Sequence, residues 1–396
     1  MRVTHFLNSM RPGHDGVTRV AYRLRQGFKA YPDKHVFVAP TLPKSANSDM
    51  LKVPSVPFPL STDYRLPVCT PDSVGMIIKK FRSDVIHIHT PCTLGLSSVR
   101  AAEALNIPSI ATYHTHFPTY LEYYKVEALR PWIWKYLKSL YRSCDAVIVP
   151  SKTTLLELQK EGGFKNLVHI PHGVDTRRFS IRHKDDEWRA SVGGKNKIIV
   201  TFVGRLVWEK NLKLLAEAAK LVETNKQIRW VVVGDGPARA KFEKMMPNAH
   251  FTGFLGEHDL PTAYASSDIF VFPSVTETFG NVTIEAMASG LPAICVAAGG
   301  AKDIVTPGQN GFLSPPDDPL SFAQSIDLLV RKPELRAQLS QGALESSALY
   351  NWDNTVRRYR EIYQNAVKSR NSRTLPKSAV SRKSRVKRFF MPSLRK

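Results

Sequence analysis

The stretch IFVFPSVTETFGNVTIEAMASGLPAICV, residues 269–296, holds two short apolar runs separated by a loop and a helical segment. The runs 269–272 and 293–296 are typical of strands that are buried on both faces, and 282–288 is expected to form the helix between them. Two parallel strands joined through a helix are the repeating unit of an α/β sheet. The stretch therefore predicts a doubly wound parallel sheet.

The same alternation of strands and helices extends through the chain and is interrupted over residues 177–197, which are charged and have no apolar period. We expect an N-terminal domain at 1–176, a linker at 177–197, a C-terminal domain at 198–350 and a helix at 351–370 that crosses back to the first domain. The proline-rich segment 53–72 is expected to be an irregular loop. The other predicted strands are 3–7, 35–39, 84–89, 109–113, 146–149, 167–170, 198–203, 228–233 and 250–252.

The composition is that of an ordinary globular protein with an excess of positive charge. The 396 residues are 43% hydrophobic and 23% charged, which excludes a disordered chain, a collagen-like fibre and a disulfide-stapled miniprotein. The 56 Lys and Arg against 34 Asp and Glu give a net charge of +22. Such a charge predicts an acidic partner: nucleic acid, an anionic membrane or phosphorylated small molecules.

Cysteine usage and hydropathy indicate a cytoplasmic protein. Cys69, Cys92, Cys144 and Cys295 are far apart and form no C-x-x-C pair, so reduced thiols are expected rather than disulfides or a zinc site. No stretch approaches the roughly 20 apolar residues of a spanning helix, and the N-terminus does not resemble a signal peptide. We therefore expect any membrane contact to be peripheral, at the inner face.

Two glutamates eight positions apart, Glu277 and Glu285, are the strongest chemical signal. The backbone N–H groups of Phe279, Gly280 and Asn281 are expected at a helix N-terminus, which suits the binding of a diphosphate. Glu285, about one turn inside the helix, can accept hydrogen bonds from two ribose hydroxyls, and Glu277 can face a sugar ring. The alternative is a capped helix with solvated glutamates.

The segment PSVTETFGNVTIEAMASGLP, residues 273–292, resembles the retaining glycosyltransferases of family 4, which have the GT-B fold. The resemblance covers about residues 1–367. It implies an α/β protein with two doubly wound, Rossmann-like domains that face each other across a cleft, the second of which holds the nucleotide. Further matches are VGR at 203–205 with EK at 209–210, VGDGP at 233–237, SSD at 266–268 and IPHGVD at 170–175.

Two segments of the first half are most similar to the branch of this family that glycosylates lipids. They are DGVTR at 15–19 and YHTHFPTY at 113–120, and the branch contains α-mannosyl-, glucosyl- and sulfoquinovosyltransferases. The resemblance implies transfer of a hexose from a UDP- or GDP-linked donor to a lipid or lipid-linked glycan, with retention of configuration. Transfer to a soluble sugar or a polysaccharide precursor is the alternative.

The resemblance also implies roles for individual residues. Arg205 and Lys210 are expected to bind the donor diphosphate, and two cations five positions apart after a strand can indeed flank a pyrophosphate. Gly16 is expected to let a loop approach the phosphate, His114 to contact the donor sugar, and Leu255 to place backbone groups near the base. The alternatives are surface cations and ordinary turn residues.

No metal and no other cofactor is expected. The sequence has no Asp-x-Asp, and the cations and the helix N-terminus can neutralise the leaving diphosphate themselves. The pairs His114-x-His116 and His87-x-His89 invite a metal interpretation, but no cysteine or carboxylate cluster accompanies either of them. The second pair is more typical of packing inside a buried strand.

Two basic segments could contact anionic lipid. Residues 130–142, RPWIWKYLKSLYR, combine aromatic and basic side chains, with Ile133, Leu137, Leu140 and Tyr141 on one apolar face, as in helices that lie on a membrane. The alternative is a helix packed on its own sheet. The tail 371–396 has nine Lys or Arg and no Asp or Glu, and its composition predicts disorder in water.

Three other classes of protein fit less well. A dinucleotide-dependent oxidoreductase needs G-x-G-x-x-G, and the turn at 234–239 lacks the third glycine. A nucleic-acid-binding protein is suggested by charge alone, without a recognisable module, so we expect no nucleic-acid partner. A carbohydrate-binding protein without activity is disfavoured by the complete set Arg205, Lys210, Glu277 and Glu285.

Overall fold

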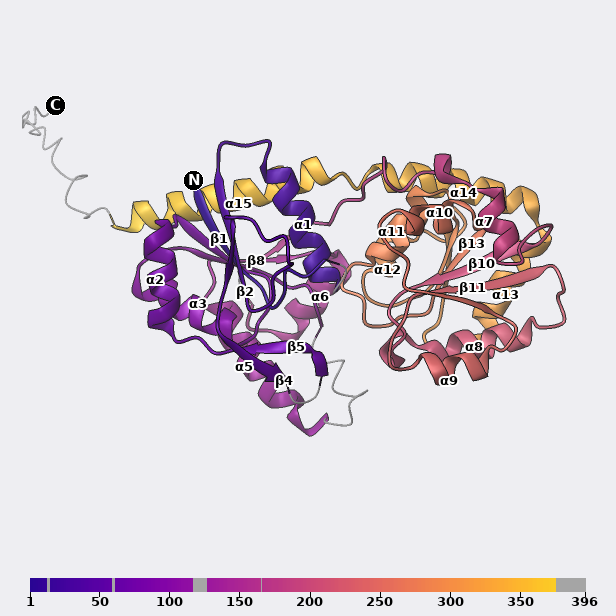
Figure 1. Cartoon of the computed structure of the whole chain (residues 1–396), viewed down its shortest axis with the longest axis horizontal. Helices are drawn as coiled ribbons and strands as arrows, with labels where there is room; N and C mark the ends of the chain where they lie inside the picture. Colours follow the sequence, from indigo (N-terminus) through magenta and orange to yellow (C-terminus); the bar gives the residue numbers. More distant parts are fainter. Residues whose placement is uncertain (13–14, 59–60, 117–126, 165, 375–396) are drawn as a thin grey trace, which may run out of the picture.

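The computed structural model describes residues 1–12, 15–58, 61–116, 127–164 and 166–374. It consists of two α/β domains that lie side by side, with the last helix running along the first (Figure 1). The tail was predicted to be disordered from residue 371, but residues 371–374 continue the last helix. Residues 375–396 lie outside the described residues. Among the described helices, none has both the length and the hydropathy needed to cross a bilayer.

The first domain is built on a seven-stranded parallel sheet with the order β3-β2-β1-β6-β7-β8-β9. Helices α2, α3 and α5 pack on one face, and α1 and the last helix pack on the other. The elements are β1 (Arg2–Phe6), α1 (Gly16–Phe28), β2 (Lys34–Ala39), β3 (Met50–Lys52), α2 (Pro71–Phe81), β6 (Val85–Ile88), α3 (Thr93–Ala104), β7 (Ser109–Thr112), η1 (Glu127–Leu129), α5 (Arg130–Arg142), β8 (Ala146–Val149), α6 (Lys152–Glu161) and β9 (Leu167–His169).

The second domain is built on a six-stranded parallel sheet with the order β12-β11-β10-β13-β14-β15. The prediction of two doubly wound parallel sheets is therefore confirmed. The elements are β10 (Ile198–Val203), η3 (Trp208–Lys210), α8 (Leu212–Leu221), β11 (Ile228–Val233), α9 (Arg239–Met245), β12 (His250–Gly253), α10 (Asp259–Ala265), β13 (Ile269–Phe272), α11 (Asn281–Ala288), β14 (Ala293–Val296), α12 (Ala301–Ile304), β15 (Gly311–Ser314), α13 (Pro319–Arg331) and α14 (Pro333–Ala348).

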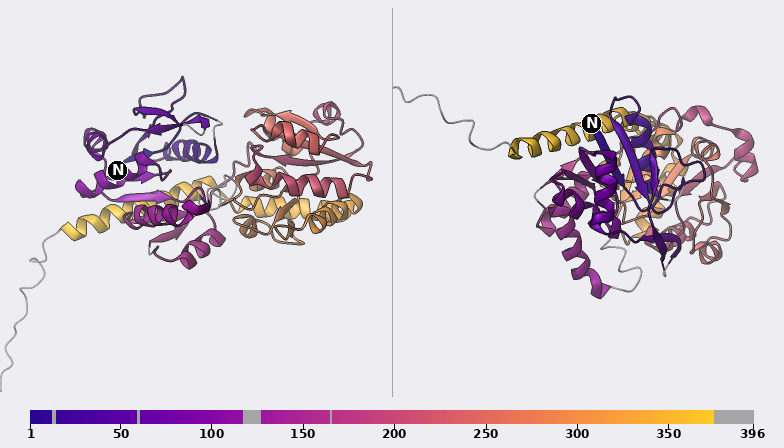
Figure 2. Two further views of the ribbon diagram at one scale, coloured as in Figure 1. Left: turned by 90° about the horizontal axis from the view of Figure 1, so that it is seen from below. Right: turned by 60° about the vertical axis from the view of Figure 1, so that its left-hand side comes forward.

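The last helix, α15 (Trp352–Thr374), connects the second domain to the first. It starts beside the second domain and extends along the first, as both views in Figure 2 show. Its residues Val356, Tyr359 and Tyr363 are buried in one core cluster with Val3 and Val20. Burying such aromatic side chains contributes on the order of 2 kcal/mol each, so the first domain is completed by the end of the chain.

The segment 53–72, expected to be an irregular loop, instead contains an antiparallel hairpin of β4 (Ser55–Phe58) and β5 (Ser61–Pro67). Arg65 fixes the pairing because its guanidinium donates to the hydroxyl and the carbonyl oxygen of Ser55, at 2.8 and 2.9 Å. Prolines are tolerated because this sheet has only edge strands. Helix α2, which was not predicted, follows with a capping box between Thr70 and Ser73.

The segment 177–197 is also more ordered than the predicted linker. It contains η2 (Ile181–His183) and α7 (Asp186–Ser191), which Asp185 caps by accepting from the N–H of Trp188. Phe179 and Val192 are buried in the core of the second domain. The many charges of this segment obscured a short capped helix, and the segment belongs structurally to the second domain.

Candidate active site

The carboxyl ends of β10 and β13 define the centre of the site. These strands are neighbours, and the chain order of the second sheet reverses between them, which is where ligands bind in open α/β sheets. Arg205 is exposed just after β10, and the loop with Glu277 follows β13. The predicted cation and the predicted carboxylate therefore lie at adjacent strand ends.

The backbone beside Arg205 is held by the turn that follows β11. Gly234 has φ of 132°, and a Cβ there would lie 1.9 Å from the carbonyl oxygen of Gly204. The N–H of Leu206 donates to the carbonyl oxygen of Asp235 at 2.9 Å. Only glycine permits this close approach, so the VGDGP turn acts here as a support for the loop after β10.

Lys210 and Glu277 form an ion pair between the Lys Nζ and one carboxylate oxygen, and both side chains are mostly buried. The loop of Glu277 is supported from behind, because the N–H of Gly300 donates to the Glu277 carbonyl oxygen at 2.8 Å. The structure thus brings these two predicted residues together.

Helix α11 begins directly after this loop and opens toward the first domain. Gly280 precedes it with φ of 105°, and no side chain of the described residues caps its first turn. A Cβ on Gly16, the first residue of α1, would lie 3.9 Å from Nδ2 of Asn281. Phe279 has a buried side chain, so only its backbone is available to a ligand. The first residues of α1 and α11 therefore meet at the domain boundary, and the Asp15 carboxylate caps α1 by accepting from the N–H of Thr18 at 2.7 Å.

Glu285 is bound by an arginine of the first domain, which the sequence did not predict. The Arg19 guanidinium donates to both carboxylate oxygens, at 2.9 and 3.2 Å, and the Tyr264 hydroxyl donates at 3.4 Å. The charge of Glu285 raises the pKa of Arg19. Arg19 belongs to the DGVTR motif, but a contact across 266 positions leaves no local signal. A ribose at Glu285 would have to share or displace this arginine.

His114 lies opposite the Glu277 loop. Its carbonyl oxygen accepts a hydrogen bond of 2.6 Å from the hydroxyl of Thr278, and its Nε2 is 3.1 Å from Nδ1 of His89. Burial lowers the pKa of His114 well below the usual value, so the imidazole is neutral. The carbonyl is therefore already occupied, and Nδ1 is the ring nitrogen that remains for a ligand.

The remaining histidines of the two H-x-H pairs have different neighbours. The His116 ring packs edge-on against Tyr113 and Trp134. His87 and His89 are buried as predicted, but both are also hydrogen-bonded.

A cluster of His5, His87 and His89 has the spacing of a metal site. All six ring nitrogens already have hydrogen-bond partners among the described residues, however. The partners include Thr112 at 2.8 Å and Tyr363 at 2.7 Å for His87, and the histidines themselves for the others. A metal ion here would have to break these bonds.

Leu255 follows β12, the edge strand of the second sheet, and its half-buried side chain packs on the core of that domain. It lies farther along the sheet from the Lys210–Glu277 pair than Arg205 does. The structure therefore places this residue at one end of the candidate site rather than at its centre.

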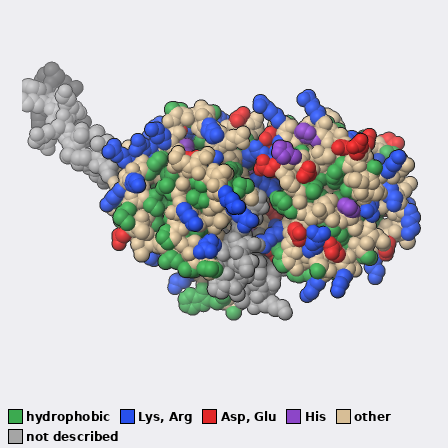
Figure 3. Space-filling model, in the orientation of Figure 1, with side chains coloured by type: hydrophobic (Ala, Val, Ile, Leu, Met, Phe, Trp, Pro, Cys, Tyr) green, Lys and Arg blue, Asp and Glu red, His purple; other side chains and the backbone are tan. Residues whose placement is uncertain are grey.

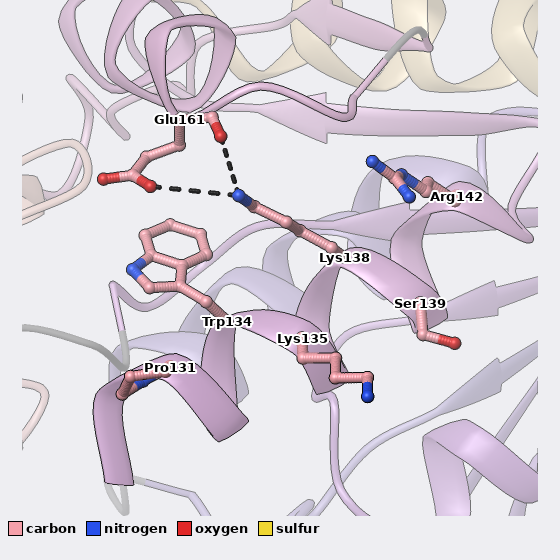
Figure 4. Close-up of a pocket in the computed structure, with 7 residues that line it drawn as sticks. All are labelled: Pro131, Trp134, Lys135, Lys138, Ser139, Arg142 and Glu161. Atoms are coloured by element: carbon pink, nitrogen blue, oxygen red, sulfur yellow. Dashed lines mark hydrogen bonds and ion pairs between the residues drawn. The ribbon is translucent and has the colours of Figure 1, made fainter. Parts of the chain in front are cut away.

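Helix α5 packs its apolar face on its own domain. Leu137, Leu140 and Tyr141 of the predicted apolar face are buried in the first core together with Trp134. The alternative of a helix packed on its own sheet therefore holds, and only the outer side of the helix remains accessible. The Lys138 ammonium donates to the carbonyl oxygen of Glu161 at 2.7 Å, and both residues line the pocket shown in Figure 4.

Comparisons with known proteins show the family of the chain. The family described as Glycosyltransferase Family 4 matches residues 14–178, and Glycosyl transferases group 1 matches 184–346. A GDP-mannose-dependent alpha-mannosyltransferase of Corynebacterium glutamicum is 34% identical over 79% of this chain and 76% of that protein. Sulfoquinovosyl transferase SQD2 of Arabidopsis thaliana is 33% identical over 78% of this chain and 62% of that protein. An alpha-monoglucosyldiacylglycerol synthase of Streptococcus pneumoniae is 28% identical over 94% and 87%, respectively.

Solved structures show the same fold. Sucrose-phosphate synthase from Thermosynechococcus elongatus superposes with a TM-score of 0.77 at 21% identity, over 93% of this chain and 100% of that one. Anabaena HepE, solved in complex with UDP and glucose, superposes with a TM-score of 0.74 at 18% identity, over 92% and 100%.

Proposed function

The chain belongs to glycosyltransferase family 4 and has the GT-B fold, and from this premise we propose that it transfers a hexose from a nucleotide diphosphate sugar to a lipid or lipid-linked glycan. One observation carries the proposal. The Lys210–Glu277 pair and the uncapped N-terminus of α11 lie in one loop region of the second domain, and His114 faces that region from the first domain.

We propose that the donor diphosphate lies between Arg205, Lys210 and the start of α11. Anions bind well at helix N-termini, where unpaired N–H groups and the helix dipole act together. Cations on the other side would stabilise the charge that develops as the diphosphate leaves. The same cations make a metal ion dispensable, so the proposed reaction is metal-independent.

The α configuration of the donor is proposed to be retained. Glu277 is held by Lys210, which suits a carboxylate that orients the sugar better than one that attacks it. In the proposed step the acceptor oxygen attacks from the face that the diphosphate leaves, the bond to the diphosphate breaks, and a diphosphate oxygen takes the acceptor proton. Closure of the two domains would exclude water and limit hydrolysis.

The names of the relatives support a lipid acceptor and two donor classes. One relative is named for GDP-mannose and another for a glucosyldiacylglycerol product, and HepE was solved with UDP-glucose. We propose a UDP- or GDP-linked hexose as donor. A soluble sugar acceptor remains the second candidate, because the solved neighbours include sucrose-phosphate synthase.

The test is a donor screen followed by a transfer assay. The productive nucleotide sugar should raise the Tm of the full chain, because a ligand that binds only the folded state stabilises it. Transfer should then occur to diacylglycerol in anionic vesicles and persist in EDTA. No shift with any UDP- or GDP-sugar would contradict the donor proposal. Activity lost in EDTA and restored by magnesium would contradict the metal-free step.

Replacing Glu285 with glutamine should weaken nucleotide binding at least about tenfold, since charged acceptors bond hydroxyls more strongly than neutral ones. The measurement is calorimetric titration of the nucleotide identified in the screen. Glu334→Gln, at an exposed position on α14, is the matched control. Equal affinity of the Glu285 variant and the wild type would remove the carboxylate from the ribose site.

We propose that the protein is cytoplasmic and binds the inner face of the membrane through the outer side of α5 and the basic tail. Trp132 has 70% of its surface exposed, and the Lys135 ammonium lies over its ring, 5.9 Å from the centroid. Aromatic and basic side chains of this kind favour an anionic interface. Figure 3 shows that Lys and Arg are also spread over both domains, so the contact must be tested locally.

The double variant Trp132→Ser with Lys135→Glu should reduce flotation with anionic vesicles by about tenfold. Removal of residues 375–396 should reduce flotation further, because helix α5 and the tail would bind the same membrane surface together. Leu349→Ser with Lys241→Glu, both exposed on the second domain, is the control. Unchanged flotation of the α5 variant would reject this surface. A salt-dependent mobility shift with nucleic acid would favour the rival partner.

A further inference from the structure

Four histidines form a continuous hydrogen-bonded chain across the first sheet. Nδ1 of His35 lies 2.9 Å from Nε2 of His5, whose Nδ1 lies 3.1 Å from Nε2 of His89. Nδ1 of His89 in turn lies 3.1 Å from Nε2 of His114. The four residues come from β2, from β1 and from the ends of β6 and β7, which are consecutive strands of the sheet. The chain therefore ends at the candidate active site.

All four imidazoles are neutral. Burial lowers the pKa of His35 to about 4 and that of His89 to about 3, and it lowers the pKa of His5 and His114 well below the usual value. Each neutral ring carries one N–H. Four N–H groups serve three hydrogen bonds, so one N–H is left over at an end of the chain.

The three hydrogen bonds between these histidines must all run in the same direction. His5 and His89 each use both ring nitrogens, so each must donate with one nitrogen and accept with the other. Reversing one bond would therefore reverse all three. The spare N–H belongs either to Nε2 of His35 or to Nδ1 of His114.

The surroundings of His35 decide between the two ends. Its Nε2 is buried and has no hydrogen-bond partner among the described residues, and its ring stacks on Phe28 with 4.0 Å between the centroids. A buried N–H without an acceptor is rare and costly, more so than an unpaired acceptor. Nε2 of His35 is therefore the unprotonated nitrogen, and every ring in the chain carries its proton on Nδ1.

We propose that His89, backed by His5 and His35, is a positioning residue that fixes His114 as the Nδ1–H tautomer and so presents a hydrogen-bond donor to the cleft. The tautomer of a histidine is set by the bond that its other nitrogen makes, as in carboxylate-supported sites. Its use in the reaction rests on the proposed function. There the Nδ1–H would donate to an oxygen of the donor sugar or of the diphosphate.

The first measurement needs no substrate. In the full chain labelled with ¹⁵N-histidine, the couplings between ring nitrogens and ring protons distinguish the two tautomers, and His114→Gln assigns the signal. We expect the Nδ1–H form at His114. The Nε2–H form at His114 in the wild type would overturn the proposal, and this result does not depend on transferase activity.

The second measurement uses three variants. His89→Phe removes the bond to His114 and should convert most of that ring to Nε2–H, whereas His89→Gln, which can both donate and accept, should keep Nδ1–H. His87→Phe, equally buried in β6 but bonded to Thr112 and Tyr363, should leave the tautomer unchanged. Retention of Nδ1–H in His89→Phe would show that His89 does not set it.

Kinetic measurements then distinguish a positioning role of His89 from a purely structural role. In His89→Phe we expect kcat to fall about tenfold, with a smaller change in donor KM, because Nδ1 of His114 then no longer carries the hydrogen that it would donate to the substrate. His89→Gln should recover most of that loss. A loss in kcat that is the same in His87→Phe and His89→Phe would indicate a structural role only. An inactive wild type with His114 in the Nδ1–H form would count against the proposed function and not against the hydrogen-bonded histidine chain.

Discussion

Replacing Lys210 with alanine is expected to lower kcat by about 100-fold, the usual effect of removing one preorganised group that stabilises developing charge. Lys210 is mostly buried beside Glu277, so its charge acts in a poorly solvated site, where it is worth more than in water. The measurement is transfer from the nucleotide sugar that the thermal screen identifies. Lys213→Ala, at an exposed position on the neighbouring helix α8, should keep wild-type turnover.

The close pair with Glu277 allows two explanations of such a loss, and a double variant separates them. If Lys210 acts on the diphosphate, combining Lys210→Ala with Glu277→Gln should lower kcat below either single change. If Lys210 only holds Glu277 in place, the double variant should be no slower than Glu277→Gln, because groups that act as one unit are not additive. Wild-type turnover of Lys210→Ala would remove the lysine from the site altogether.

The parts of the fold that the sequence predicted share one physical property. Strands such as β10 and β13 are buried on both faces, so they appear as continuous apolar runs with sharp ends. The predicted residues Glu277 and Arg205 directly follow such strands, which is why their place at adjacent strand ends could be expected. Hairpin β4–β5 was missed because prolines weaken the strand signal and the pairing depends on Arg65.

The contacts that were missed at the site join distant parts of the chain. Arg19 reaches Glu285 only after both domains have formed, and no spacing in the sequence relates the two residues. The pair His87 and His89 was correctly predicted to be buried, yet its bonds go to His5, His114 and Tyr363 on other elements. The spacing of two residues in a strand predicts that both histidines point to the same buried face, but it does not predict which side chains on neighbouring strands they bond.

Buried neutral histidines should make the protein strongly sensitive to acid. His5, His87, His89 and His172 have almost no exposed surface, and burial is the first cause that lowers the pKa of each, to about 3 for His89 and about 4 for His172. In the unfolded chain these groups bind protons near the ordinary pKa of 6.5. Unfolding therefore takes up protons below that value, and the stability present at neutral pH is lost as the pH falls.

The size of this effect follows from linkage. Between about pH 7 and pH 5, each histidine that stays neutral in the folded state lowers the free energy of unfolding by about 2 kcal/mol. Four of them give about 8 kcal/mol, which is comparable to the whole stability of a typical domain. Carboxylates that are ion-paired in the folded state add to acid unfolding only below about pH 5, so this window isolates the histidines.

The expected result is a fall in Tm of at least about 20 °C between pH 7 and pH 5. Unfolding near pH 5 should take up at least about four protons, because burial lowers the pKa of His35 and His114 as well; the uptake is measured by calorimetry in buffers of different ionisation enthalpy. His87→Gln removes one of these groups and should lower the uptake by about one proton, whereas His258→Gln, at an exposed position, should leave it unchanged. A Tm that is constant over this range would mean that the buried histidines are already charged, and the neutral hydrogen-bonded chain through His5 and His89 could then not exist.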